Sequence, residues 1–271
     1  MAQEGLSQEE AFARIRLLRS PRIGPVGYVR LLRRFGNAVA AVEALPDVAR
    51  RGGGRYTAAP VEQIEREIVA ARTAGARYLF HDSPDYPARL AEMENAPPIL
   101  TWRGGLSLAG APCVGVVGAR NASAAAVKLA REFSAALAGE GFVVVSGLAR
   151  GIDGAAHEGA LDGGSEGSGG TIGVIASGID IAYPPQHAAL QERIATQGLL
   201  FAEQPPGTQP RGPHFPSRTA LSPACRSARW WLRRRRNPAP SSPRGWRVRR
   251  GARSWPSPAA RWSRAAWGAT S

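Results

Sequence analysis

The stretch FVVVSGLARGIDGAAHEGAL (residues 142–161) decides the fold of this chain. Its first four residues are apolar and mostly β-branched, as is typical of a strand that is buried on both faces. Ser146 and Gly147 open a turn of small residues, and an alanine-rich run with helical character follows. A buried strand that passes through a glycine turn into a helix predicts one unit of an α/β sheet.

The same pattern occurs on both sides of this stretch. CVGVVGARNAS (113–123) is a buried strand with a glycine turn, and it precedes a helix predicted over residues 124–141. TIGVIASGIDIAYPP (171–185) is a third strand, and LLFAEQPPG (199–207) is a fourth, after a helix at 187–198. The alternation predicts an α/β, Rossmann-like fold with a doubly wound, mainly parallel sheet that is covered on both faces. We place this domain at residues 76–218.

Residues 1–75 predict a small helical domain. EEAFARIRLLRS (9–20) and EQIEREIVAARTAG (62–75) have apolar residues at helical spacing. Between them, Gly24 and Gly27 form a short turn before an amphipathic run from Tyr28 to Phe35. Such a turn can offer backbone N–H groups to a phosphate, as helix-hairpin-helix modules do, or it can be an ordinary helix–helix connection. The residues alone leave both interpretations open.

The net charge of +14 comes almost entirely from the end of the chain. Residues 219–271 contain 13 Arg, no Lys, Asp or Glu, and six of the seven Trp, which leaves 22 basic and 21 acidic residues before them. The high density of Pro, Ser, Gly and Arg without periodicity predicts a disordered tail. The two cysteines, Cys113 and Cys225, indicate neither a disulfide framework nor a metal site. With no signal peptide and no apolar run of membrane-spanning length, we expect a cytoplasmic protein without membrane contact.

Three predicted strand ends carry glycines together with polar donors. Ligands of such sheets bind where the carboxyl ends of the strands enter loops. The loops here are 118–120, 146–151 and 177–180. Glycines admit a ligand close to the backbone, helix N-termini carry partial positive charge, and Arg120 and Arg150 suit phosphate groups. The pattern favours a polyanion such as a nucleic-acid backbone, and the alternative is tight turns with ordinary solvated arginines.

No pattern in the chain requires catalysis, a metal or a cofactor. The spacing Gly115-x-x-Gly118 is not the dinucleotide fingerprint, which argues against a nicotinamide site. We expect Asp153 to cap its helix and His157 to be structural, because no second His or Cys stands at ligand spacing. We find no Ser-His-Asp set, no paired carboxylates in one loop and no Walker A loop.

Three motifs resemble the DNA-processing protein A family, also called Smf. They are VGVVGARNAS (114–123), VVVSGLARGIDGAAHEGAL (143–161) and IGVIASGIDIAYPPQH (172–187), and the resemblance continues through LLFAEQPPGTQPRGPHFPSR (199–218). It covers about residues 78–218. The preceding helical segment resembles that family's N-terminal helix-hairpin-helix-like, or sterile-alpha-motif-like, domain.

The resemblance implies a bacterial, cytoplasmic, non-enzymatic protein with a Rossmann-like fold. Such proteins bind single-stranded DNA, form homodimers and load the RecA recombinase during natural transformation. Their DNA pocket corresponds here to Gly118, Ala119 and Arg120, with Ala119 in place of a hydroxyl residue. The same surface would include Lys128, Ser146, Gly147, Arg150, Gly151, Gly212, His214, Phe215 and Arg218.

Two other classes of protein share the strand and glycine-turn layout. A nucleotide phosphoribohydrolase of the lysine-decarboxylase-like group would need a catalytic Glu/Arg pair in a Pro-Gly-Gly-x-Gly-Thr type loop, which this sequence lacks. A nucleotide-binding regulatory module is the second alternative.

The family pattern stops at Arg218. Removing one base from a coding sequence for Asn-Arg-Leu-Ile-Ala-Gly-Leu, the family's continuation, yields Thr-Ala-Leu-Ser-Pro-Ala-Cys, as found at 219–225. The same shift turns an Ala-Val-Val-Val strand into the Arg-Trp-Trp-Leu of 229–232. Our hypothesis is that residues 219–271 are translated out of frame, and the rival is a basic, Trp-interleaved nucleic-acid-binding arm. Loss of the family's later strands and dimer region predicts an open apolar sheet edge and an unstable or weakly active chain.

Overall fold

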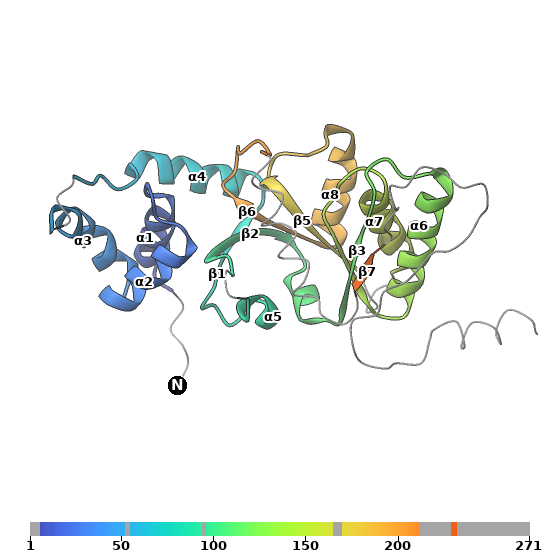
Figure 1. The fold of residues 1–271 in the computed structure, drawn as a ribbon, viewed down its shortest axis with the longest axis horizontal. Coiled ribbons are helices and arrows are strands. Elements are labelled where there is room, and N and C mark those ends of the chain that lie inside the picture. Colours follow the sequence, from blue (N-terminus) through green and yellow to red (C-terminus); the bar gives the residue numbers. More distant parts are fainter. Residues whose placement is uncertain (1–5, 52–54, 94–95, 165–169, 212–228, 232–271) are drawn as a thin grey trace, which may run out of the picture.

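The computed structural model describes residues 6–51, 55–93, 96–164, 170–211 and 229–231. A group of helices comes first and a mixed α/β region follows, so that the molecule is elongated (Figure 1). The helices are α1 (Gln8–Arg19), α2 (Pro25–Phe35), α3 (Ala38–Arg51) and α4 (Val61–Thr73). They precede β1 (Arg77–Phe80), α5 (Ala88–Ala91), β2 (Ile99–Gly104) and the 3-10 helix η1 (Leu106–Gly110).

The rest of the chain alternates strands and helices, as the sequence predicts. Its elements are β3 (Cys113–Val117), α6 (Ala124–Gly139), β4 (Val143–Ser146), α7 (Ile152–Gly163), β5 (Thr171–Gly178), η2 (Pro185–His187), α8 (Ala188–Gln197), β6 (Leu199–Gln204) and β7 (Arg229–Trp231). The strand order is β1-β2-β6-β5-β4-β3-β7. The pairs β7–β3, β3–β4, β4–β5 and β5–β6 are parallel. The pairs β1–β2 and β2–β6 are antiparallel. The predicted α/β class with a mainly parallel sheet is confirmed.

The three long helices of this region cover one face of the sheet. Val114, Val116 and Val144 pack against α6 and α7, while Ile175 and Leu200 pack in a cluster with α8. The strand register places all five side chains on the same face. Each step from β3 to β6 moves one strand in the same direction, and right-handed crossovers then place every helix on the same side.

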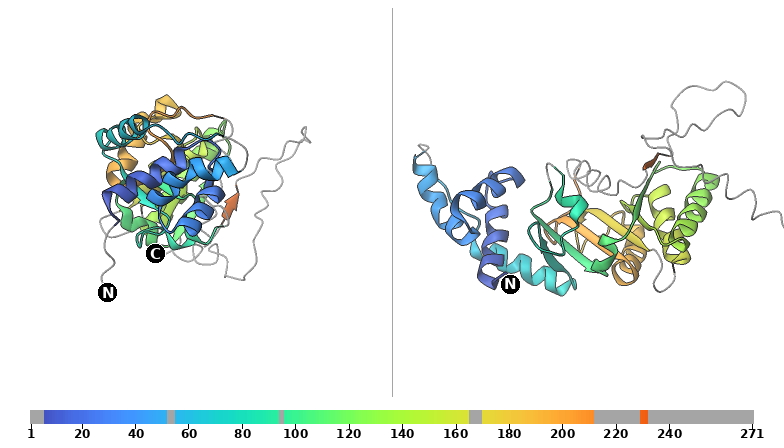
Figure 2. Two further views of the ribbon diagram at one scale, coloured as in Figure 1. Left: turned by 90° about the vertical axis from the view of Figure 1, so that its left-hand side faces the viewer. Right: turned by 90° about the horizontal axis from the view of Figure 1, so that it is seen from below.

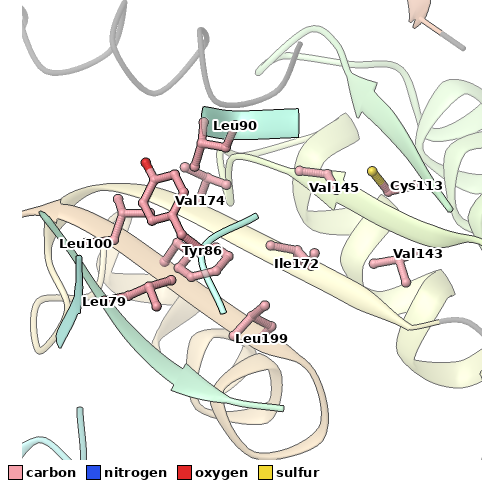
Figure 3. Close-up of a cluster of buried hydrophobic side chains, with 11 residues drawn as sticks. Leu79, Tyr86, Leu90, Leu100, Cys113, Val143, Val145, Ile172, Val174 and Leu199 are labelled. Atoms are coloured by element: carbon pink, nitrogen blue, oxygen red, sulfur yellow. The ribbon is translucent and has the colours of Figure 1, made fainter. Parts of the chain in front are cut away.

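The opposite face of the sheet is covered by short segments of chain. Alternate residues from β3 to β6 form its cluster: Cys113, Val143, Val145, Ile172, Val174, Leu199 and Phe201 (Figure 3). The short helix α5 contributes Leu90, and Tyr86 from the preceding turn packs beside it and donates a hydrogen bond to Pro97 O at 2.8 Å. Residues of the 3-10 helix η1 also pack there, so among the described residues short segments and not a long helix cover this face.

Strand β7 lies at the edge of the sheet that is expected from the sequence to be open. It pairs in parallel with residues 115–117 of β3. The expectation of an open edge is thus wrong along this part of β3, because unpaired N–H and C=O groups at a sheet edge are satisfied by an added strand. The remainder of the predicted disordered tail lies outside the described residues.

The helical region packs on the antiparallel end of the sheet (Figure 2). Its own core contains Leu17, Tyr28, Ala38, Ala41, Val42 and Leu45. A second cluster joins Ile15 of α1 and Ile64 of α4 to Ile99 of β2. Arg14 of α1 also forms an ion pair with Asp82, which follows β1. The two regions are therefore connected by both apolar and ionic contacts.

Candidate nucleic-acid interface

The first two predicted turns lie against each other at the carboxyl ends of β3 and β4. Gly151 has a φ of +76°, and a β-carbon there would lie 2.4 Å from Ala119 O and 2.7 Å from Arg120 O. The N–H of Ile152 donates to Ala119 O at 3.3 Å. The structure therefore brings residues 118–120 together with Gly151, as the sequence predicts from two separate loops.

Gly118 and Asp153 form a second link between these turns. A β-carbon on Gly118 would lie 2.6 Å from Ile152 Cγ1, and the N–H of Gly118 donates to Asp153 Oδ1 at 3.3 Å. Asp153 is buried, and the N-cap of α7 is Gly151, without a side-chain cap. Oδ1 of Asp153 thus serves the neighbouring turn, and the expectation that Asp153 also caps its own helix stays a prediction.

The predicted site residues divide into exposed and buried groups. Ala119, Arg120 and Arg150 are exposed, and so is Lys128, whose Nζ lies 3.7 Å from a carboxylate oxygen of Glu132. Ser146 is buried and donates its hydroxyl proton to Val116 O at 2.6 Å, and Gly147 beside it is also buried. Ser146 and Gly147 thus support the surface from beneath. Gly212, His214, Phe215 and Arg218 lie outside the described residues.

The two helix N-termini at this surface differ electrostatically. Helix α6 begins after Ser123, whose hydroxyl accepts from the N–H of Ala126 at 3.4 Å, and its first turn contains no acidic residue. Helix α7 carries Asp153 in its first turn, and two of its first N–H groups already donate to the loop carbonyls of Ala119 and Ala149. The N-terminus of α6 therefore attracts an anion more strongly than that of α7.

The strand order places this surface at a switch point of the sheet. The chain moves from β3 through β4 and β5 to β6 in one direction, whereas β7 lies on the other side of β3. In open α/β sheets the ligand crevice lies outside the carboxyl ends of the strands at such a reversal. The turn 118–120 follows β3 directly, so topology points to the same turn as the sequence motif.

The third predicted turn is occupied by its own hydrogen bonds. Asp180 accepts from the N–H of Gly207 at 2.8 Å, and the N–H of Gly178 donates to Thr208 O at the same distance. Ser177 donates to Ile181 O at 2.7 Å. This turn carries a carboxylate instead of a cation, so it adds less to a polyanion surface than the first two turns.

Two supporting residues have no clear signal in the sequence. Leu148 adopts a φ of +55° although it is not glycine, and it is fully buried. His187, which precedes α8, donates from Nδ1 to Leu148 O at 3.0 Å. A leucine does not mark a left-handed backbone position, and the histidine lies 39 residues away, so neither was predicted.

The structural role predicted for His157 is confirmed. Its side chain is fully buried, and Nδ1 lies 2.7 Å from Thr171 Oγ1. Because Thr171 donates its own proton to Val144 O at 2.8 Å, the imidazole donates to the threonine oxygen. Among the residues that the structure describes, no group of three or more His, Cys, Asp or Glu side chains could hold a metal ion. No helix in the same residues has the length and apolar character needed to span a bilayer.

The fold and this surface define an α/β protein with a Rossmann-like sheet and an attached helical domain. Residues 77–228 match the family described as DNA recombination-mediator protein A, and residues 8–70 match the DprA-like N-terminal HHH domain. The chain belongs to the DNA recombination-mediator protein A family. The match extends ten residues beyond Arg218, where the sequence motifs end.

Two similar proteins support this assignment. The chain is 42% identical over 136 residues to the DNA processing protein DprA of Streptococcus pneumoniae, covering 50% of this chain and 46% of the relative. It is 40% identical over 149 residues to Protein Smf of Synechocystis, covering 54% and 36%. The matches thus span between a third and a half of the length of these relatives.

Two solved structures resemble the fold. The X-ray structure of DNA processing protein A from Streptococcus pneumoniae has a TM-score of 0.57 at 28% identity, covering 82% of this chain and 71% of that one. The protein from Helicobacter pylori, whose structure concerns a single-stranded DNA binding mode, has a TM-score of 0.50 at 26% identity. That match covers 58% of this chain and 69% of that one.

Proposed function

We propose that this chain binds single-stranded DNA at the surface formed by turn 118–120, the start of α6 and Arg150. The observation that carries the proposal is the contact between the two turns. Arg150 precedes Gly151, whose backbone touches the carbonyl oxygens of Ala119 and Arg120. Two exposed arginines therefore belong to adjoining turns at the switch point of the sheet. The single-stranded DNA binding of the Helicobacter pylori relative agrees with this assignment.

The chemistry of the surface suits a phosphate backbone better than a base. The guanidinium groups of Arg120 and Arg150 offer planar pairs of donors, and the N-terminus of α6 adds partial positive charge. Because Gly118 has no side chain, the turn packs directly against Ile152. Such a surface contacts charge and not base edges, so binding should show little sequence preference and strong salt dependence.

We infer that the chain acts by binding and not by catalysis. The polar groups of the two turns are engaged in structural contacts: Asp153 with Gly118, and Ser146 with Val116. A phosphoribohydrolase would need a catalytic Glu/Arg pair in its glycine-rich loop, whereas the carboxylates of these turns, Asp153 and Asp180, accept backbone N–H groups of Gly118 and Gly207. A phosphoribohydrolase or a nucleotide-binding regulatory module should bind AMP or NAD. A protein that binds only single-stranded DNA should not.

The test is fluorescence anisotropy with labelled oligo-dT, with AMP and NAD as competitors. We expect Arg120→Ala/Arg150→Ala to weaken binding and to reduce the salt slope by about 1.4, because each phosphate contact on a single strand contributes about 0.7. The matched control is Arg66→Ala/Arg72→Ala, which removes two exposed arginines from α4. All variants carry the same basic tail, so its contribution is common to each. Unchanged binding in the first variant, or displacement by AMP, would reject the proposal.

The wider role is also a proposal, since the chain matches only part of its relatives. The family resemblance supports a cytoplasmic homodimer that hands single-stranded DNA to the RecA recombinase in natural transformation. Sedimentation of the purified chain tests the dimer. Co-purification with RecA, with and without oligo-dT, tests the partner, and loss of transformation in a strain without the gene tests the pathway.

A further inference from the structure

The N-terminal helical domain has an unusual distribution of charge. From residue 11 to residue 42 the sequence contains seven arginines and no Asp or Glu. Three of these arginines have structural partners. Arg14 binds Glu10 at 2.9 Å, Arg16 donates to Ala59 O at 2.8 Å, and Arg19 binds Glu67 at 3.0 Å. These three contribute to the packing of α1 against its neighbours.

Three others form a row on the exposed face of α2. Arg30, Arg33 and Arg34 stand at positions i, i+3 and i+4, which place their side chains on one face of a helix. Val26, one turn earlier on the same face, is 54% exposed. Tyr28 on the other side of the helix is buried in the domain core. We call Val26, Arg30, Arg33 and Arg34 the α2 basic face.

No carboxylate neutralises this face in the part of the chain that the structure describes. The ion pairs of the helical region involve Arg14, Arg19 and Arg50. Arg34 stacks its guanidinium 5.2 Å from the centroid of the Phe35 ring, which leaves its charge in place. Neighbouring like charges on one helix face destabilise the helix by a few tenths of a kcal/mol. Arg33 and Arg34 lie in the last turn of α2, where cations interact favourably with the helix dipole. Arg30 lies outside that turn, so the dipole does not account for a row of three, whereas binding to a polyanion uses all three charges.

We propose that the α2 basic face is a second binding site for the phosphodiester backbone of nucleic acid. One helical turn separates the arginines by about 5.4 Å, and phosphates repeat about every 3.4 Å of axis along a strand of duplex DNA. A rigid row of guanidinium groups therefore meets a continuous row of charges. The choice of nucleic acid as the polyanion rests on the proposed DNA-binding function.

This face is separate from the surface formed by turn 118–120, the start of α6 and Arg150, which we call the strand-tip surface. Helix α2 lies in the helical region at one end of the molecule, and α6 lies at the other end (Figures 1 and 2). The two surfaces therefore contact different parts of a nucleic acid, and a change in one leaves the other intact. The face has no exposed aromatic ring for base stacking among its four residues, so its contacts are to the backbone and apply to single-stranded and duplex DNA alike.

The first experiment is site-specific photo-crosslinking with the full chain. A photoreactive amino acid replaces Val26, and in a matched variant it replaces Val69 of α4, which is 60% exposed. Labelled oligo-dT and a labelled duplex of the same length are the probes. We expect crosslinks from position 26 and at least about tenfold fewer from position 69. Equal yields from the two positions would overturn the proposal.

The second experiment measures charge. We compare Arg30→Ala/Arg33→Ala/Arg34→Ala with a control of equal charge loss, Arg51→Ala/Arg66→Ala/Arg72→Ala, in exposed positions of α3 and α4. The first triple variant should weaken DNA binding several-fold more than the control and reduce the salt slope by about 2 on single strands, because three contacts each contribute about 0.7. If the α2 triple variant and its control bind DNA equally well, the site is rejected. Binding of both variants to anionic lipid vesicles is measured in parallel. The site is also rejected if the α2 substitutions weaken vesicle binding but not DNA binding.

These outcomes are independent of the strand-tip surface. If the proposed function fails, Arg120→Ala/Arg150→Ala binds oligo-dT normally, whatever the α2 variant does. If only this inference fails, the α2 variant matches its control while the strand-tip variant loses affinity. Far-ultraviolet circular dichroism of each variant verifies that the exposed substitutions leave the helices folded.

Discussion

Gly151 approaches Ala119 so closely that a β-carbon on Gly151 would lie 2.4 Å from the carbonyl oxygen of Ala119. Because the φ of Gly151 is also positive, an alanine there meets both backbone strain and a collision. We expect Gly151→Ala to destabilise the chain by more than about 2 kcal/mol and to displace the turn that carries Arg120. Urea unfolding and oligo-dT anisotropy measure the two effects.

The matched control is Gly141→Ala, where φ is +83° but nothing lies within 4 Å of an added β-carbon. Its cost should be only the left-handed backbone strain, about 1–2 kcal/mol, with normal DNA binding. Equal effects of the two substitutions would show that the contact with Ala119 has no role in positioning the turn.

The hydrogen bond between Gly118 and Asp153 makes a second prediction. Asp153→Ala leaves the half-buried N–H of Gly118 without this acceptor, which costs about 1 kcal/mol. Asp153→Asn keeps an acceptor oxygen and should lose less stability. Both are measured by urea unfolding. If Asn costs as much as Ala, the negative charge and not the hydrogen bond is what stabilises the two turns.

Ala119 allows a gain of function to be tested. It is exposed at the start of the proposed phosphate contact, and the family resemblance implies a hydroxyl residue there. We expect Ala119→Ser to strengthen oligo-dT binding by up to about fivefold, the equivalent of one added hydrogen bond of about 1 kcal/mol. Ala188→Ser, at the exposed first position of α8, should leave affinity unchanged.

The ion pair between Arg14 and Asp82 predicts a pH dependence of stability. Burial opposes ionisation of Asp82, but the hydrogen bond and charge of Arg14 outweigh it and lower the pKa of the carboxyl. A lowered pKa in the folded state stabilises the chain above the unfolded pKa of about 3.9, and this contribution disappears as the pH falls through the folded value. The carboxylate is 59% exposed, so we expect less than about 1 kcal/mol.

Urea unfolding at pH 7 and at pH 3 tests this contribution. Asp82→Asn should lower stability at pH 7 and lose less of it on acidification than the parent. Asp47→Asn, which removes an exposed pair within α3, is the control. An Asp82→Asn variant with the parent's full pH dependence would contradict the role of the pair.

The reading frame after Arg218 is open to direct test. We expect resequencing of the gene across this codon to reveal a shifted frame, and a frame-restored chain to unfold at higher temperature and bind oligo-dT more tightly than the 271-residue chain. An uninterrupted frame to Ser271 in several isolates would refute the hypothesis, and cooperative unfolding of the present chain would argue against its predicted instability.

The sequence predicts the parallel part of the fold well because its information is local. The run of buried residues at 142–145 corresponds to β4 within one residue, and the alternation predicts every helix from α6 to α8. Helix α3 lies within the segment predicted to be helical, but it contains Pro46, so its bounds are not marked by a clear pattern. The antiparallel pairing of β1 and β2 depends on contacts between distant residues, which local patterns do not encode.

The site was predicted in part for the same reason. Glycine turns followed by arginine are visible in the sequence, and the structure confirms that the turns at 118 and 151 meet. The direction of the Asp153 carboxylate, the burial of Ser146 and the support of Leu148 by His187 all depend on how neighbouring loops pack. Such contacts appear only once the sheet is assembled.

The position of β7 beside β3 has a genetic consequence. Strand β7 runs parallel to β3 and reaches the level of Val117, so the two sides of the switch point are encoded by codons more than a hundred positions apart. A frameshifting insertion or deletion after codon 150 and before codon 229 rewrites the later side and leaves residues 118–120 and 150 untouched. Mutation at the DNA level can therefore reshape one half of the crevice while the other half is inherited without alteration.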